Sequence, residues 1–135
     1  MSERAYPLPK RVGAVSAREV ADILSEVKAN LTIETRTQAE LYAHLCARLP
    51  AMAPAIEREV RLSERDRVDI WVNGIVIEVK LQGASKFAVY KQIKRYAEDT
   101  RVEALILATN LLMALPPKIE GKPAYLVPLG VAWMR

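Results

Sequence analysis

The stretch Arg67-Val-Asp-Ile-Trp-Val-Asn-Gly-Ile-Val-Ile-Glu-Val-Lys80 decides the fold of this 135-residue chain. Apolar residues alternate with other residues before Asn73-Gly74 and resume after it, which is the strongest short sequence signal for a β-hairpin. A two-residue loop pairs Val72 with Ile75 and thereby fixes the register of all the other pairs. The predicted hairpin has one wholly apolar face, formed by Val68, Ile70, Val72, Ile75, Ile77 and Val79.

The other face of the predicted hairpin carries two carboxylates. The same register places Asp69 directly opposite Glu78, and Arg67 opposite Lys80. Directly opposed carboxylates have Cβ atoms about 4.5–5.5 Å apart and repel each other. A hard divalent cation such as Mg²⁺ relieves this repulsion and prefers oxygen ligands. The residues alone therefore suggest a metal site, and the simpler alternative is a solvated face on which each acid pairs with Arg67 or Lys80.

Helical and strand patterns flank the hairpin on both sides. Capping-box patterns that start at Ser16 and Thr37 predict a leading helix over 17–30 and a second helix that ends at Pro50. The order of helix, three strands, helix and strand is typical of an α/β fold with a mixed sheet. The other predicted elements are strands at 56–62, 104–108 and 125–129 and a helix at 86–99.

Composition narrows the class of protein. The length is that of a single domain over residues 1–135, in which 1–16 form a basic arm. Twenty Lys and Arg against sixteen Asp and Glu give a net charge of +4, a weak indication of a polyanionic partner. One cysteine excludes a disulfide framework and a cysteine-rich metal site. The longest mostly apolar stretch, 104–115, falls short of the about 20 residues that span a membrane, so we expect a cytoplasmic protein without a membrane segment.

Asp69, eight intervening residues and Glu78-Val79-Lys80 in a hydrophobic strand resemble the motif of the PD-(D/E)XK nuclease superfamily. Many members also carry a glutamate in the helix before the first strand, and Glu40 occupies that position here. Gln92-Ile-Lys-Arg-Tyr96 matches the Q-x-x-x-Y signature of the RecB-like branch. The resemblance covers about residues 37–110. It implies a restriction-endonuclease-like αβββαβ core, with a mixed central sheet flanked by helices.

The resemblance also implies a metal site for Mg²⁺ or Mn²⁺. Asp69, Glu78 and the Val79 carbonyl would hold the cation, which polarises the scissile phosphate and activates water. Lys80 would orient that water and offset the developing charge. Glu40 would complete the site or hold a second metal, although it could equally serve the capping box at Thr37.

The third predicted helix would supply further groups to this site. By resemblance, Gln92 would approach the water or phosphate, and Tyr96 either the nucleic-acid backbone or the packing behind the site. His44 lies one turn after Glu40, and its role stays open. Phosphate contacts, which position DNA without reading its sequence, are expected from Arg67, Lys86, Lys91, Lys94 and Arg95.

Three functions fit these expectations. The first is a Mg²⁺-dependent deoxyribonuclease of RecB-like type, either an exonuclease or an endonuclease. The second is a structure-selective endonuclease resembling Holliday junction resolvases. The third is a non-catalytic nucleic-acid-binding or assembly module that keeps the fold. Since a chain this short covers little DNA, a homodimer or a larger complex is also expected.

Overall fold

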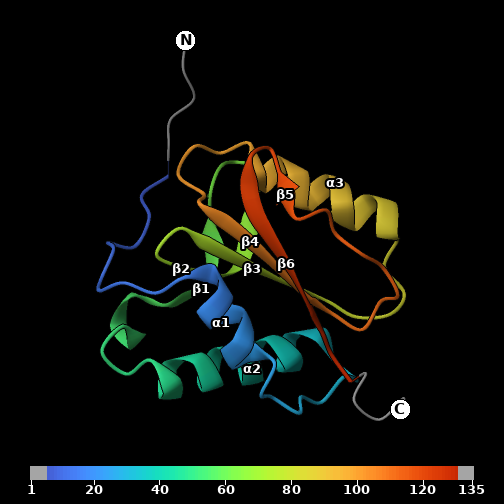
Figure 1. Cartoon of the computed structure of the whole chain (residues 1–135), viewed down its shortest axis with the longest axis horizontal. Coiled ribbons are helices and arrows are strands. Elements are labelled where there is room, and N and C mark those ends of the chain that lie inside the picture. The colour runs from blue at the N-terminus through green and yellow to red at the C-terminus, as the bar shows by residue number, and fades with distance from the viewer. Residues whose placement is uncertain (1–5, 131–135) are drawn as a thin grey trace.

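The predicted hairpin lies within a mixed six-stranded sheet in the computed structural model, which describes residues 6–130 (Figure 1). The strand order is β1-β2-β3-β4-β6-β5. Strand β2 runs antiparallel to its neighbours β1 and β3, whereas β3, β4 and β6 are parallel. The strands are β1 (Glu57–Arg61), β2 (Arg67–Val72), β3 (Ile75–Lys80), β4 (Ala104–Thr109), β5 (Lys118–Ile119) and β6 (Lys122–Pro128).

Three α-helices cover the two faces of the sheet, as Figure 1 shows. Helices α1 (Ala17–Leu24) and α2 (Glu34–Arg48) share a buried cluster with one face, and α3 (Lys86–Ala97) with the other. A short 3₁₀ helix, η1 (Ala53–Ala55), leads into β1. Strand β4 is buried along its whole length, as its continuous apolar sequence predicted. The α/β class and the mixed sheet are thus confirmed.

The register of the hairpin is confirmed from the turn as far as the pair Ile70 and Ile77, where the β2–β3 ladder ends. The predicted Asp69–Glu78 pair is not part of this ladder. Val68 packs in the cluster on the α3 side, whereas Ile70 packs on the side of α1 and α2. The prediction of one apolar face that includes Val68 is therefore wrong, because the alternation breaks at Asp69.

Two predicted helix boundaries are also corrected. Helix α1 ends at Leu24, six residues before the predicted end at 30. Val27 and Leu31, whose spacing suggested a longer helix, pack on the core from the segment that follows it. Helix α2 begins at Glu34, so Thr37 lies inside it instead of capping it. The Thr37 hydroxyl donates to the Ile33 carbonyl at 3.2 Å.

The basic arm runs across the hairpin turn. The side chain of Asn73 accepts from the N–H of Val12 at 3.0 Å and donates to its carbonyl at 2.9 Å. Arg11 pairs with Glu103 in the chain segment before β4. Residues 11 and 12 of the arm are thus tied to the body of the fold, and the part of the arm over 1–5, which includes Arg4, lies outside the described residues. In the part of the chain that the structure describes, every helix is too short or too polar to cross a membrane.

Candidate active site

Glu78 lies on the α3 face of β3, and its side chain is only 2% exposed. One carboxylate oxygen, Oε2, is 3.2 Å from Lys80 Nζ. The other, Oε1, is buried and has no hydrogen-bond partner among residues 6–130. Burial, followed by the charge of Asp69, raises the pKa of Glu78 to about 8. A buried acceptor without a partner is costly to the fold, and a bound cation or an added donor would relieve that cost.

Asp69 is held beside Glu78 by the backbone of the neighbouring strand. Its Oδ2 accepts a hydrogen bond of 2.8 Å from the N–H of Val79. Burial raises the pKa of Asp69 to about 6, although the Val79 N–H and the charge of Lys80 act in the opposite direction. The break in the β2–β3 ladder therefore places a carboxylate next to the backbone of Val79, the residue whose carbonyl the resemblance names as a ligand.

Lys80 completes this group at the carboxyl end of β3. Burial alone would lower the pKa of Lys80, but the charges of Glu78, Asp69 and Glu34 raise it above its ordinary value. The ammonium group is therefore positive at neutral pH. Its side chain is 21% exposed and lines an open hollow, so Lys80 connects the buried carboxylates with solvent.

The acid that α2 brings to this site is Glu34, not Glu40. Glu34 Oε2 accepts from the N–H of Leu81, directly after β3, at 2.9 Å. Glu40 instead accepts from the N–H of Asn30, in the segment before α2, at 2.7 Å. The signal for Glu34 is present in the sequence: stepping back from the apolar position Leu41 by helical spacing leads to Gln38 and then to Glu34.

Gln38, which the sequence analysis also missed, supports Asp69 from α2. Its Nε2 donates to the Asp69 carbonyl at 3.0 Å and to Glu59 Oε2 at 2.9 Å. Glu59 lies on β1 between Arg58 and Val60, which pair with Ile70 and Val68, and has a left-handed backbone with φ of 55°. The amide of Gln38 therefore satisfies the backbone and side-chain oxygens at the point where the sheet opens.

The two signature residues of α3 take different positions. Gln92 lines the open hollow of about 280 Å³ together with Lys80, so both reach the same space. Tyr96 is fully buried, and its hydroxyl donates to the Arg67 carbonyl at 3.1 Å. Burial and then Glu78 raise the pKa of Tyr96. Of the two roles expected for Tyr96, its position is consistent only with packing behind the site.

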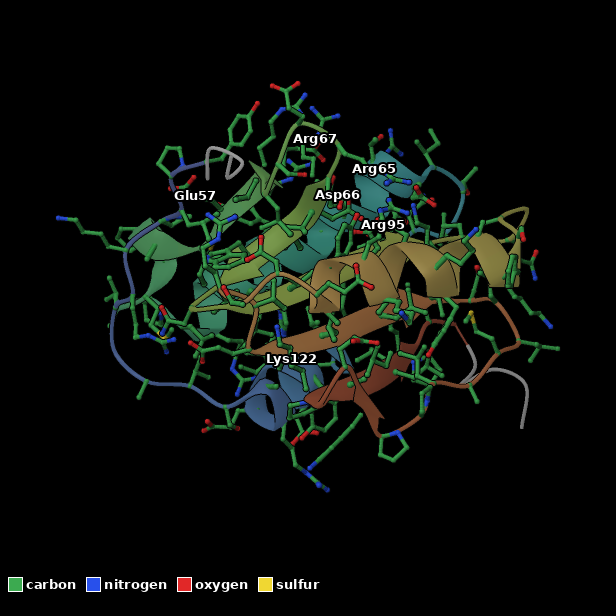
Figure 2. The ribbon with its side chains drawn as sticks, turned by 90° about the horizontal axis from the view of Figure 1, so that it is seen from above. Glu57, Arg65, Asp66, Arg67, Arg95 and Lys122 are labelled. Carbon is green, nitrogen blue, oxygen red and sulfur yellow. The ribbon has the colours of Figure 1, made fainter. Side chains whose placement is uncertain are left out.

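Most of the predicted phosphate-binding residues have acidic partners. Arg95 binds both oxygens of Asp66 through its guanidinium group. Figure 2 shows this pair, with Arg67 nearby. Arg67 pairs with Glu59 at 3.1 Å and lies opposite Arg61 on β1. Its predicted pairing with Lys80 is not part of the β2–β3 ladder, which ends at Ile70 and Ile77. Lys94 pairs with Glu98 and Glu120.

Two basic residues of α3 are left for a ligand. Lys86 and Lys91 form no ion pair within residues 6–130.

His44 binds Glu26 at 2.7 Å, and Arg48 binds the same carboxylate. The interaction of His44 is therefore with the segment after α1, and the structure gives it no contact with Asp69 or Glu78.

The donor set at the end of β3 fits a hard cation with few protein ligands. Among residues 6–130, no group of three or more His, Cys, Asp or Glu side chains is placed to hold a metal. Asp69 and Glu78 offer two carboxylates, and Glu78 Oε1 lacks a partner that a cation would supply. Mg²⁺ commonly keeps several waters and takes one or two protein carboxylates. The two acids are therefore compatible with Mg²⁺ or Mn²⁺.

Comparisons with known proteins add nothing to this geometry. No family model matches the chain. No curated protein and no solved structure matches it at a significant level.

Proposed function

We propose that this protein is a metal-dependent nuclease that hydrolyses DNA phosphodiester bonds at Asp69, Glu78 and Lys80. The observation that carries the proposal is the buried Glu78 carboxylate with one unpartnered oxygen, beside a second acid and a lysine. The chain order α2-β1-β2-β3-α3-β4 supports a restriction-endonuclease-like αβββαβ core. The hairpin motif and the α3 signature support the RecB-like branch of the PD-(D/E)XK superfamily.

Asp69 and Glu78 would hold the divalent cation, together with the Val79 carbonyl. When bound, Mg²⁺ or Mn²⁺ supplies charge neutralisation at the scissile phosphate and lowers the pKa of a water molecule. The Val79 N–H fixes the Asp69 carboxylate, and burial and the contact with Lys80 hold Glu78. Both acids are therefore positioned before a substrate arrives, which reduces the reorganisation needed during the reaction.

Lys80 and Gln92 would act on the phosphate from the open hollow. The Lys80 ammonium is positive, so it offsets the negative charge that develops on the phosphate oxygens in the transition state. The Gln92 amide can donate to a phosphate oxygen and accept from a water molecule. Glu34, which accepts from the Leu81 N–H, adds a further carboxylate near Lys80 and contributes, after Glu78 and Asp69, to raising the pKa of Lys80.

A non-catalytic binding module is the second candidate. It is favoured by one observation, namely that the described residues gather no third metal-ligating side chain with Asp69 and Glu78. In that case Glu78 would bind Lys80 as a neutral or singly charged pair, and Lys86 and Lys91 would still attract phosphates. DNA binding without cleavage is the result that this candidate predicts.

The test is cleavage of linear, circular and branched DNA in the presence of Mg²⁺ or Mn²⁺. Asp69→Asn and Lys80→Ala should each abolish cleavage, while Lys118→Ala, at an exposed lysine on β5, should leave it unchanged. Loss of linear DNA alone indicates an exonuclease, nicking of circles an endonuclease, and selective cutting of branches a structure-selective enzyme. Cleavage that persists in both Asp69→Asn and Lys80→Ala overturns the site assignment.

A further inference from the structure

Large apolar side chains are exposed around the candidate active site. Among residues 6–130, four large apolar residues are exposed, and the most exposed are Leu112 at 74% and Phe87 at 72%. Ile33, at 49%, is the third, and Val12 on the basic arm is the fourth. Phe87 lies in the first turn of α3, Leu112 in the loop that follows β4, and Ile33 at the cap of α2.

The three segments that carry Ile33, Phe87 and Leu112 meet where β3 and β4 end. Glu34, next to Ile33, contacts the Leu81 N–H directly after β3. Lys80 pairs with Thr109, the last residue of β4, and the loop at 110–117 follows. Figure 1 shows the start of α2, the start of α3 and this loop on the same side of the molecule. Phe87 lies in the chain between Ser85 and Ala88, which line the Lys80 hollow, and the segments of Ile33 and Leu112 lie at the same end of the sheet.

Positive charge accompanies the exposed aromatic ring. Helix α3 contains four basic residues, Lys86, Lys91, Lys94 and Arg95, and no acidic residue. Lys91 Nζ lies 5.2 Å from the centroid of the Phe87 ring, and the high exposure of Phe87 leaves much of the ring open to a ligand. An aromatic face beside unpaired lysines matches a polyanion that also offers flat π surfaces.

We infer that the site takes single-stranded nucleic acid, with Phe87 stacked on an unpaired base and Lys86 and Lys91 on the adjoining phosphates. The inference rests on the proposed nuclease function for the chemistry, but not for the binding. In a duplex the faces of the bases are covered by their neighbours, whereas an unpaired base exposes a face that an aromatic side chain can cover. Phe87 would therefore discriminate single strands and frayed ends from intact duplex.

The test measures binding without hydrolysis. In EDTA, the full chain is titrated against a fluorescein-labelled oligo(dT) strand and against a blunt duplex of the same length. Phe87→Ala should weaken binding of the single strand by on the order of 10- to 100-fold, the value expected for loss of one stacked base. Duplex affinity should stay unchanged. Val12→Ala is the matched control, because it removes an exposed apolar side chain on the arm.

Phe87→Leu separates stacking from general apolar contact. Leucine keeps an apolar side chain but has no ring, so this variant should bind the single strand almost as weakly as Phe87→Ala. Wild-type affinity of Phe87→Ala for oligo(dT) overturns the inference, and so does wild-type affinity of Phe87→Leu. If Phe87→Ala lowers the oligomeric state in solution but leaves oligo(dT) binding unchanged, the inference is also overturned, in favour of a second copy on this surface. Phe87-dependent binding without any cleavage overturns only the nuclease proposal.

Discussion

The carboxylate of Asp69 accepts a 2.8 Å hydrogen bond from the backbone N–H of Val79. In an antiparallel ladder, hydrogen-bonded pairs alternate with non-hydrogen-bonded pairs. If the register of Ile70 opposite Ile77 continued, the N–H of Val79 would donate to the carbonyl of Val68. The Asp69 side chain takes the place of that backbone acceptor. A side-chain hydrogen bond has therefore replaced one backbone hydrogen bond between β2 and β3, and it fixes the Asp69 carboxylate beside these strands.

Asp69→Asn should abolish stabilisation by metal without unfolding the protein. The amide oxygen of asparagine can still accept from the Val79 N–H, whereas the charge that attracts a cation is gone. Wild-type protein should be stabilised by Mn²⁺ at a concentration of 100 Kd by about 2.7 kcal/mol, and the variant not at all. Thermal melts with and without Mn²⁺ measure this, with Glu57→Gln as the control on exposed β1. Equal stabilisation of both proteins by Mn²⁺ contradicts the site.

Glu78→Gln should make the stability of the metal-free protein less sensitive to pH. The folded-state pKa of Glu78 is about 8 against an ordinary 4.5, so the folded protein binds this proton more tightly than the unfolded chain. Its contribution to stability is full below about 4.5 and is lost as the pH rises to about 8. Glutamine cannot ionise and lacks this loss.

Urea unfolding in EDTA across this pH range measures the effect of Glu78→Gln. As the pH rises, the free energy of unfolding of the variant should increase relative to that of the wild type by up to about 1.4 kcal/mol per pH unit. A difference between the two proteins that is constant with pH would show that Glu78 is ionised throughout.

Glu34→Gln and Glu40→Gln form a matched pair on one helix. Glu34→Gln keeps an oxygen for the Leu81 N–H but removes the charge near Lys80, so we expect cleavage to fall by roughly 10- to 100-fold. Glu40→Gln keeps an oxygen for the Asn30 N–H and should leave cleavage unchanged. Initial rates at saturating Mg²⁺ make the comparison. The reverse ranking would restore Glu40 as the acid of the site.

Tyr96→Phe should lower stability more than it lowers DNA affinity. The change leaves the Arg67 carbonyl without its donor inside the protein, which costs about 1–3 kcal/mol. Urea unfolding reports this cost, and Tyr90→Phe on the same helix, where the ring is only partly buried, is the control. Loss of DNA affinity at unchanged stability would place Tyr96 on the nucleic acid instead.

The sequence predicted the sheet well because its signals are local. The Asn73-Gly74 turn fixes the register of the pairs nearest to it, and the unbroken apolar run of β4 fits a strand covered on both faces. The pairing at Asp69 could not be read from alternation, since it depends on a side chain that replaces a backbone acceptor. Whether Asp69 and Glu78 hold a metal is a chemical prediction that no pattern of the fold decides.

The start of helix α2 was mispredicted for a different reason. The pattern at Thr37 matches a capping box, yet tertiary packing lets α2 start at Glu34, with no side-chain cap. Capping contributes only about 1 kcal/mol, so burial of Leu41 and Leu45 outweighs it. The buried apolar positions in the middle of the helix, Leu41 and Leu45, therefore predict which acidic residue faces the sheet better than the capping pattern does.

The parallel alignment of β3, β4 and β6 has a consequence for the evolution of specificity. Strands β3 and β4 send the segments that follow them out on one side, where the loop at 110–117 lies beside the carboxyl end of β3. Leu111, Met113 and Leu115 of that loop pack against the buried cluster on the α3 side. Insertions or deletions that keep these three residues would leave the strand register unchanged. The scaffold can therefore acquire new substrates by exchanging one connection, while the acids and the lysine stay on strands that such exchanges do not touch.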